Sequence, residues 1–173
     1  LRKHISIVLQ DPFIYAGTLL YNIRLNNENI SRESAEQALM EVGGRELMEK
    51  LDGGLDTYLP ERGATLSLGE RQLISFARAL AFDPKVLVLD EATSNVDSET
   101  EQMIQHAMKV VSRKRTTFII AHRLSTIQHA DQIIILEEGN IIERGSHQKL
   151  MEIKGVYAEM FNAQVSDKSM LNA

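Results

Sequence analysis

The 173-residue chain contains no cysteine, and no apolar run in it approaches the ~20 residues that a helix needs to span a bilayer. Without cysteine the chain can carry neither a disulfide framework nor a thiolate metal site, and it suits a reducing compartment. Basic residues are outnumbered 24 to 19 by acidic ones, and the net charge of −5 argues against a nucleic-acid partner. The remaining composition, 43% hydrophobic and 25% charged, is ordinary for a soluble globular protein.

Short apolar stretches alternate with stretches whose apolar residues recur at helical spacing. Strands are expected at residues 5–9, 86–89, 116–121, 132–136 and 141–142, and helices at 31–42, 45–51, 67–82, 98–111, 147–151 and 156–163. The alternation predicts an α/β fold with a mainly parallel sheet. Residues 18–82 are mostly helical and lie between two strands, which indicates an inserted helical subdomain. Within that block, the asparagine-rich stretch Asn22–Asn29 is expected to be a loop.

The stretch Val86–Asp97 contains the clearest chemical signal. Its four leading apolar residues predict a strand buried on both faces, and two acids, Asp90 and Glu91, follow at the strand's carboxyl end. Adjacent carboxylates beside an apolar core are costly unless a positive charge lies there, most simply a metal ion with its ligand. The alternative is a strand that ends in solvent with two exposed acids.

Polar residues also follow two of the other predicted strands. Gln10 comes after the first strand, and His122 comes after the strand at 116–121. The carboxyl ends of parallel strands lie on one edge of a sheet, where open α/β sheets place their ligands, so these groups can converge with Asp90 and Glu91. Taken singly, Gln10 reads as a loop residue and His122 as a hydrogen-bonded histidine.

Two stretches have the pattern of a helix capping box, Ser67–Glu70 and Ser98–Glu101. The first has Gly69 within it, and it presents backbone N–H groups and the positive end of a helix dipole to an anion. A plain helix cap is the alternative for Ser67.

Five stretches, in this order and spacing, resemble motifs of the ATP-binding-cassette (ABC) proteins. The match covers nearly the whole chain, to about Asn162: Gln10 resembles the Q-loop, Leu66–Glu70 the signature loop, Val86–Glu91 the Walker B strand with its catalytic glutamate, Ser94–Asp97 the D-loop and His122 the switch histidine. Gly17-Thr18 with Asn22-Ile23, and Glu61-Arg62-Gly63, are similar to the exporter branch, in which the cassette follows a membrane domain in one polypeptide.

The resemblance implies a P-loop NTPase-type, RecA-like sheet with an inserted helical subdomain, and it implies ATP and Mg²⁺ as ligands. Asp90 would hold Mg²⁺ through water, because this ion keeps several waters. Glu91 would be the general base and His122 would steady the γ-phosphate. Gln10 would contact Mg²⁺ and the attacking water while sensing the membrane domain. The implied divisions are a core strand with the Q-loop (1–16), the helical subdomain (17–83), the RecA-like core (84–163) and a tail (164–173).

The signature residues Ser67, Leu68, Gly69 and Glu70 would bind ATP held by a partner cassette in a head-to-tail dimer, with Ser67 and the Gly69 backbone on its γ-phosphate. Asp97 would couple the two sites, and the assembly would lie on the cytoplasmic face of the plasma membrane. Two residues depart from the family pattern: Leu68 replaces a usual Gly, and Glu70 replaces a usual Gln.

No Gly-x-x-x-x-Gly-Lys-Ser/Thr occurs in the chain, although the family carries this phosphate-binding loop upstream of the Q-loop. The chain also begins on Leu1 and runs at once into a strand, so we expect a piece of a longer domain. By itself it should neither bind ATP tightly nor hydrolyse it. The strand before the missing loop would lie between residues 116–121 and 132–136, so the sheet is expected to be interrupted there.

Two other functions fit parts of the sequence. Ser67, Asp90 and His122 occur in the chain order of α/β-hydrolase triads, but the Gly-x-Ser-x-Gly elbow is absent because Thr65 stands at its first position. The other alternative is a non-catalytic interaction module or an ABC ATPase that serves DNA or translation. The exporter-like segments at 17–23 and 61–63 argue against it.

Overall fold

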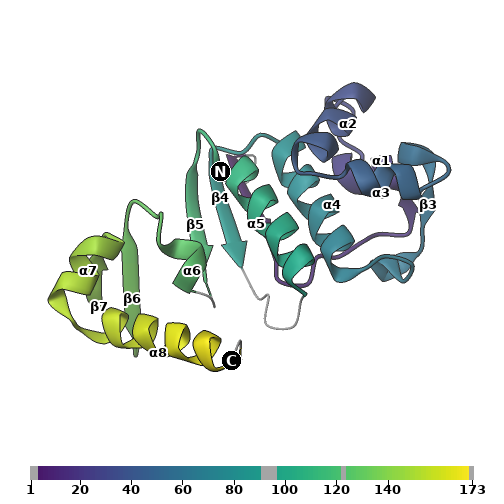
Figure 1. Ribbon diagram of the computed structural model, residues 1–173. Coiled ribbons are helices and arrows are strands. Elements are labelled where there is room, and N and C mark those ends of the chain that lie inside the picture. The colour runs from purple at the N-terminus through teal and green to yellow at the C-terminus, as the bar shows by residue number, and fades with distance from the viewer. Residues whose placement is uncertain (1–3, 91–96, 122–123, 172–173) are drawn as a thin grey trace. The chain divides into compact units, whose positions relative to one another are not determined.

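A computed structural model describes residues 4–90, 97–121 and 124–171 of the chain (Figure 1). Its residues divide into two compact units, Leu1–Ile120 and Ala121–Ala173, and each unit is described by itself. Among the described residues, no helix is both long and apolar enough to cross a membrane.

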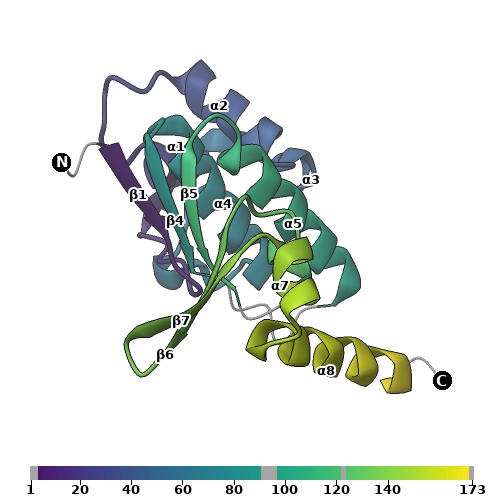
Figure 2. The same ribbon diagram turned by 90° about the vertical axis from the view of Figure 1, so that its left-hand side faces the viewer.

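The first unit contains a three-stranded parallel sheet. Strands β1 (Ile5–Val8), β4 (Val86–Asp90) and β5 (Thr116–Ile120) lie in the order β1-β4-β5. Val8 pairs with Leu89, and Asp90 pairs with Ile120. The predicted α/β class with a mainly parallel sheet is therefore confirmed, and the carboxyl ends of all three strands lie at one edge (Figure 2).

Helices α4 (Leu68–Ala81) and α5 (Ser98–Ser112) lie behind this sheet in Figure 2 and pack against each other. Leu87 and Leu89 are buried, whereas Val86 and Val88 are only half-buried. The prediction that this strand is buried on both faces is wrong for the described residues. The reason is that helices cover only one face of the sheet. The other face is open, since Phe118 of the neighbouring strand β5 is 58% exposed.

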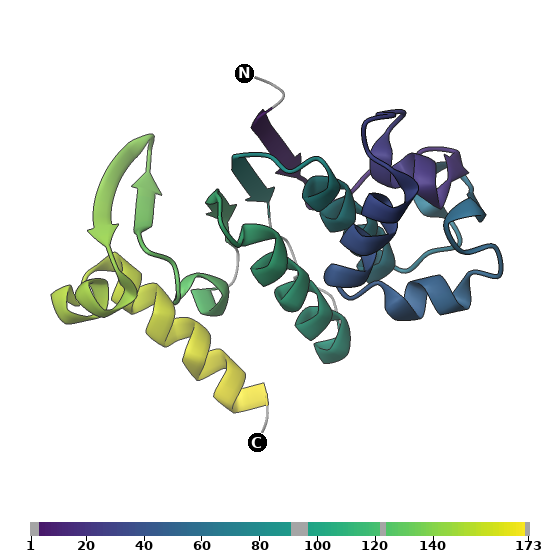
Figure 3. The same cartoon turned by 90° about the horizontal axis from the view of Figure 1, so that it is seen from above.

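The helical block lies between β1 and β4, as predicted. It comprises α1 (Leu19–Arg24), α2 (Arg32–Glu41), α3 (Arg45–Lys50), the 3₁₀ turns Gly54–Asp56 and Glu61–Gly63, and α4. A short antiparallel pair, β2 (Gly17–Thr18) with β3 (Tyr58–Leu59), closes it. Figure 3 shows α1–α3 gathered beside α4, and α1 and α2 both contact α4.

Helix α1 overturns the first part of the expected loop Asn22–Asn29, because it continues to Arg24, whereas residues 25–29 form no helix or strand, as predicted. The Thr18 side chain caps the helix by accepting a hydrogen bond from the Tyr21 N–H, and Leu19 and Ile23 are buried. Asn22 is fully buried, and hydrogen bonds between its amide and the backbone of Tyr15 offset the cost of that burial. A polar residue is therefore accommodated inside the helix by a contact from outside it.

Helix α2 begins after Ser31, as its cap predicts. The second predicted capping box is wrong by one residue, because Asp97 caps α5 and Ser98 is already helical. The reason is that the Asp97 carboxylate accepts hydrogen bonds from the backbone N–H groups of Glu99 and Thr100, at 3.1 and 2.9 Å.

The second unit contains α6 (Leu124–Ile127), an antiparallel pair of β6 (Ile133–Glu137) and β7 (Asn140–Gly145), α7 (His147–Ile153) and α8 (Val156–Leu171). Helix α8 continues beyond Ala163, where a polar tail was expected, and no glycine or proline occurs in residues 164–171 to end it. Among the described strands, β5 pairs in one sheet and β6 in another, so no continuous sheet joins them, while the place predicted for the missing strand stays a prediction.

Candidate nucleotide-binding site

The sheet edge brings together two of the predicted residues. Strands β1 and β4 are adjacent and parallel with Val8 opposite Leu89, so Asp90 ends β4 beside the point where the chain leaves β1 toward Gln10. Asp90 is half-buried and Gln10 is exposed. Glu91 and His122 lie outside the described residues, so their convergence on this edge stays a prediction.

The donor groups at this edge suit a hard cation. A carboxylate oxygen and an amide oxygen are ligands of the kind that Mg²⁺ takes, usually with several retained waters. Within the part of the chain that the structure describes, no three residues of the metal-binding types cluster together. The chemistry of Asp90 and Gln10 fits the predicted role beside Mg²⁺, and that role stays a prediction.

Helix α4 begins with the capping box that the sequence predicts. The Ser67 hydroxyl accepts a hydrogen bond from the Glu70 N–H at 3.2 Å, and Glu70 Oε2 accepts one from the Ser67 N–H at 2.7 Å. Reciprocal bonds of this kind fix the first turn of a helix, whose remaining N–H groups point toward an incoming anion.

The unusual Glu70 is paired with a cation. Lys50 Nζ, from the end of α3, lies 2.7 Å from Glu70 Oε1. Burial opposes ionisation of this carboxyl, but the hydrogen bonds from Lys50 and Ser67 outweigh it, and the pKa of Glu70 falls below its ordinary value. The extra negative charge at the signature loop is therefore offset. Lys50 was not singled out from the sequence because it lies 20 residues before Glu70.

Leu68 is the first residue of α4 and is half-buried. The loop before it is held by Arg71, whose guanidinium donates to the Leu66 carbonyl at 2.9 Å. A larger side chain at position 68 is therefore compatible with an intact capping box.

Gly69 lies against the first turns of α5. A Cβ atom there would come within 2.5 Å of Met103 Cε and 2.7 Å of Thr100 Cγ2. Thr100 is itself bound to Asp97, since its hydroxyl donates to Asp97 Oδ2 at 2.8 Å. The predicted signature glycine and the predicted D-loop aspartate are thus joined through one threonine, and close packing alone requires glycine at position 69.

Asp97 is exposed and its hydrogen bonds are directed at its own helix. Hydrogen bonds from the backbone and the hydroxyl of Thr100 and from the backbone of Glu99 lower the pKa of Asp97. The structure thus gives this residue a capping role, while its predicted role between two nucleotide sites stays untested.

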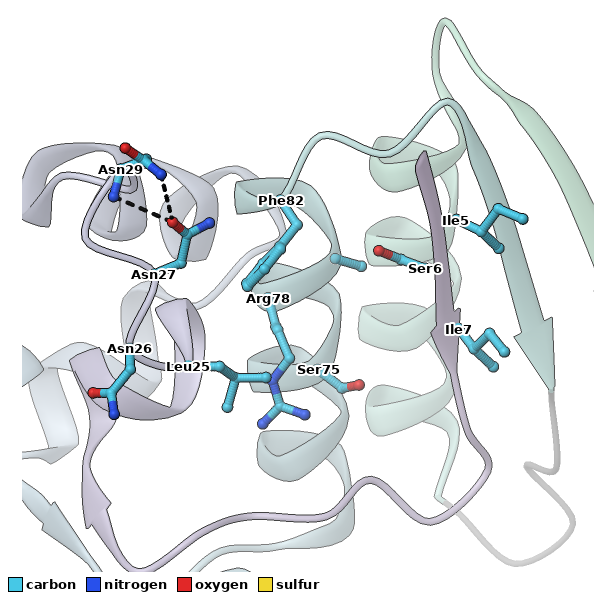
Figure 4. A pocket seen from close by; sticks show the side chains of 11 residues that line it. Ile5, Ser6, Ile7, Leu25, Asn26, Asn27, Asn29, Ser75, Arg78 and Phe82 are labelled. Atoms are coloured by element: carbon cyan, nitrogen blue, oxygen red, sulfur yellow. Dashed lines mark hydrogen bonds between the residues drawn. The ribbon is translucent and has the colours of Figure 1, made fainter. Parts of the chain in front are cut away.

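A separate cavity of about 680 Å³ opens beside β1, between this strand, α4 and the loop after α1 (Figure 4). Ile5, Ile7 and Phe82 line it with apolar surface, and Arg78 and Asn26 add polar groups. Among the described residues, none of those predicted for the site lines it.

Comparison with known proteins identifies the family. The family model described as "ABC transporter" matches residues 1–94, which is more than half of the chain. The chain belongs to the ABC transporter family. The matched part includes the sheet edge with Gln10 and Asp90, and the helix that begins after Ser67.

Relatives of this ABC protein match it over nearly its whole length. It is 53% identical over 168 residues to a probable multidrug resistance ABC transporter ATP-binding/permease protein of Bacillus subtilis, covering 97% of this chain and 25% of that protein. It is 45% identical over 165 residues to an ATP-dependent lipid A-core flippase of Photorhabdus laumondii, covering 95% and 28%.

A solved structure agrees with the fold. A bacterial Atm1-family ABC exporter with ATP bound superposes with a TM-score of 0.83 at 40% identity, over 94% of this chain and 28% of that one. The chain therefore spans about a quarter of the length of the relatives it matches.

Proposed function

We propose that this chain is the later part of a nucleotide-binding domain that binds and hydrolyses ATP to drive transmembrane export. The observation that carries the proposal is the parallel pairing of β1 with β4, which sets Gln10 and Asp90 at one sheet edge. The relatives support export over a non-transport ATPase, because they are named as an ATP-binding/permease protein, a flippase and an exporter.

In this proposal the residues at the sheet edge divide the work. Asp90 and Gln10 would hold Mg²⁺, which would neutralise charge on the phosphates when bound. Glu91 takes the proton of the attacking water as general base, and His122 donates a hydrogen bond toward the γ-phosphate. Gln10 also orients the attacking water.

The signature loop is proposed to act on a second nucleotide. Ser67 and the backbone of Gly69 bind the γ-phosphate of ATP held by a partner cassette, in a head-to-tail dimer, with Leu68 and Glu70 completing the loop. Asp97 lies between the two sites. The exposed position of Ser67 and the N–H groups of the first turn of α4 support this role. The domain then acts on the cytoplasmic face of the plasma membrane, against a transmembrane domain of the same transporter.

The hydrolase alternative has less support. A nucleophile elbow places its serine directly between a strand and a helix. Here a 3₁₀ turn, Glu61–Gly63, precedes Ser67, and the Ser67 hydroxyl caps α4. Labelling of Ser67 by a fluorophosphonate probe would favour the hydrolase.

The 173-residue chain by itself is proposed to be inactive, because its sequence contains neither the phosphate-binding loop nor the lysine of that loop. Purified alone, it should release no phosphate from Mg²⁺–ATP. Appreciable release that disappears when Mg²⁺ is removed would contradict this.

The intact protein provides the main test. Glu91→Gln keeps the shape of the side chain and removes the base, so hydrolysis should fall by about 10²–10⁴-fold, roughly 3–5 kcal/mol in the barrier. ATP binding should survive. Glu138→Gln, the same chemical change at the exposed turn between β6 and β7, should leave turnover unaltered. Nearly unchanged turnover in Glu91→Gln would remove the general-base role.

A further inference from the structure

The segment that follows β1 and carries Gln10 forms no helix or strand of its own, and side chains of α4 hold its backbone. Gln72 Nε2 donates to the Gln10 carbonyl at 2.6 Å and more weakly to the Leu9 carbonyl at 3.3 Å. Farther along, Arg78 Nη2 donates to the Phe13 carbonyl at 3.2 Å. Helix α4 therefore binds the backbone of the segment at Gln10 and again at Phe13.

Other elements fix the far end of the segment. The Arg62 N–H, in a 3₁₀ turn, donates to the Ile14 carbonyl at 2.8 Å. The backbone of Tyr15 exchanges two hydrogen bonds with the Asn22 amide of α1, at 2.8 and 2.9 Å. Of these hydrogen bonds, the one from Gln72 reaches Gln10 itself, and the others hold the residues that follow Gln10 in the chain.

Gln72 is 8% exposed, on the buried face of α4 beside Leu73 and Phe76. Burying an amide costs free energy unless the amide is hydrogen-bonded. The buried polar residues found within the described part of the first unit are Asn22, Gln72 and Ser75. Two of these three, Asn22 and Gln72, form hydrogen bonds with the backbone of the segment after β1. Both buried side-chain amides in this set therefore hold that segment in place.

Gln72 also lies close to the signature end of its helix. It follows Ser67 by five residues, which is ~7.5 Å along a helix axis. One end of α4 therefore carries the residue assigned to the partner's nucleotide, and the next turn carries the amide that holds Gln10. The Gln72 amide thus links the main chain of Gln10 to the part of α4 that follows Ser67.

We propose that Gln72 is a positioning residue, which fixes the main chain of Gln10 to α4 so that Gln10 and Ser67 keep a set relation through the ATPase cycle. This inference rests on the proposed function for its effect on turnover, but the attachment itself is a property of the fold. Replacing Arg78 would be a less specific test of this attachment, because Arg78 also donates to the Asn22 carbonyl of α1.

The kinetic test uses the intact protein with three variants. Gln72→Glu keeps the shape and replaces the donor with an acceptor that faces two carbonyl oxygens, and Gln72→Leu is a second variant that buries well. Ser75→Ala is the control, because Ser75 is buried on the same helix and forms no hydrogen bond with the described residues of the segment. Both Gln72 variants should lower kcat by about 10- to 100-fold, as misplacement of a catalytic group does.

The KM for ATP should stay within about threefold of the wild-type value in these variants, since ATP binding does not depend on a positioning contact in the way that turnover does. Ser75→Ala should match the wild type in both parameters. Gln72 variants with wild-type kcat, or variants that raise KM and leave kcat unchanged, would overturn the inference.

A distance measurement separates this inference from the proposed function. Spin labels on cysteines introduced at Asp11 and Thr65, two exposed positions, report the segment against the start of α4. The chain has no cysteine of its own to interfere. Gln72→Glu and Gln72→Leu should broaden the distance distribution, and Ser75→Ala should not. An unbroadened distribution overturns the role of Gln72 even if kcat falls, whereas a wild-type protein without ATPase activity overturns only the proposed function.

Discussion

The Glu70 carboxylate accepts hydrogen bonds on both of its oxygens, one from the Ser67 backbone and one from Lys50. These bonds favour the ionised form over the unfolded chain, and they place the folded pKa of Glu70 below its ordinary value of 4.5. The stabilisation is fully present above the unfolded pKa, and it is lost as the pH falls through the lower folded pKa.

We therefore expect Glu70→Gln to be less stable than the wild type at pH 7 and equally stable in acid. The difference should begin to shrink below about pH 4.5, the ordinary glutamate range. Urea unfolding at a series of pH values measures it, with Glu46→Gln, at an exposed position of α3, as the control. A stability difference that does not depend on pH would show that the charge on Glu70 is not what matters.

Gly69 has a packing constraint that its predicted contact with phosphate does not explain. Its Cα faces the side chains of Met103 and Thr100, and an added methyl group would overlap both. The end of Met103 can move aside, but Thr100 is branched at Cβ and is tied to Asp97.

Gly69→Ala should therefore destabilise the fold by about 1–3 kcal/mol, as overpacking does. The midpoint of urea unfolding is the measurement. Gly145→Ala is the matched control, since a Cβ there meets its nearest neighbours at an ordinary 3.4 Å. Equal stability of the two variants would contradict tight packing between the signature loop and α5.

At the scale of elements, the start of helix α5 allows a test of whether Asp97 or Ser98 is its N-cap residue. Asp97 accepts three hydrogen bonds from the first turn, whereas Ser98 is the first helical residue. Asp97→Ala should lower the unfolding midpoint, and Ser98→Ala should leave it nearly unchanged. If Ser98→Ala has the larger effect, the capping box that the sequence suggests at Ser98–Glu101 is the correct one.

Local sequence patterns predicted the elements whose signals are local. Ser31 and Ser67 each precede an apolar run at helical spacing, and α2 and α4 begin directly after them. Helix α1 was missed because Asn22 is polar by type, and its burial depends on Tyr15, seven residues earlier and outside the helix.

The site shows the same limit. Ser67, Gly69 and Glu70 could be recognised because they form one short motif. Gln72 could not, because its partners lie 62 and 63 residues earlier in the chain. The sequence shows Gln72 as a single polar residue on an otherwise apolar helix face. This pattern does not indicate which residue forms a hydrogen bond with Gln72.

At the scale of the whole molecule, the described sheet has one covered and one open face. Ile7 and Ile120, on β1 and β5, are 60% and 54% exposed. The chain spans about a quarter of its relatives, and the proposed ATP site draws on a phosphate-binding loop that its sequence does not contain. The proposed ATP hydrolysis is therefore expected of the intact protein with its proposed partner cassette, and not of these 173 residues alone.

The identity of the nucleotide retained by the intact protein tests the central claim most directly. Glu91→Gln should bind radiolabelled ATP in the presence of Mg²⁺ and still hold ATP after the unbound nucleotide is removed, because binding survives without the base. The wild type, treated in the same way, should yield ADP. Recovery of ADP from Glu91→Gln at the wild-type rate would contradict the assignment of this sheet edge as the centre of ATP hydrolysis.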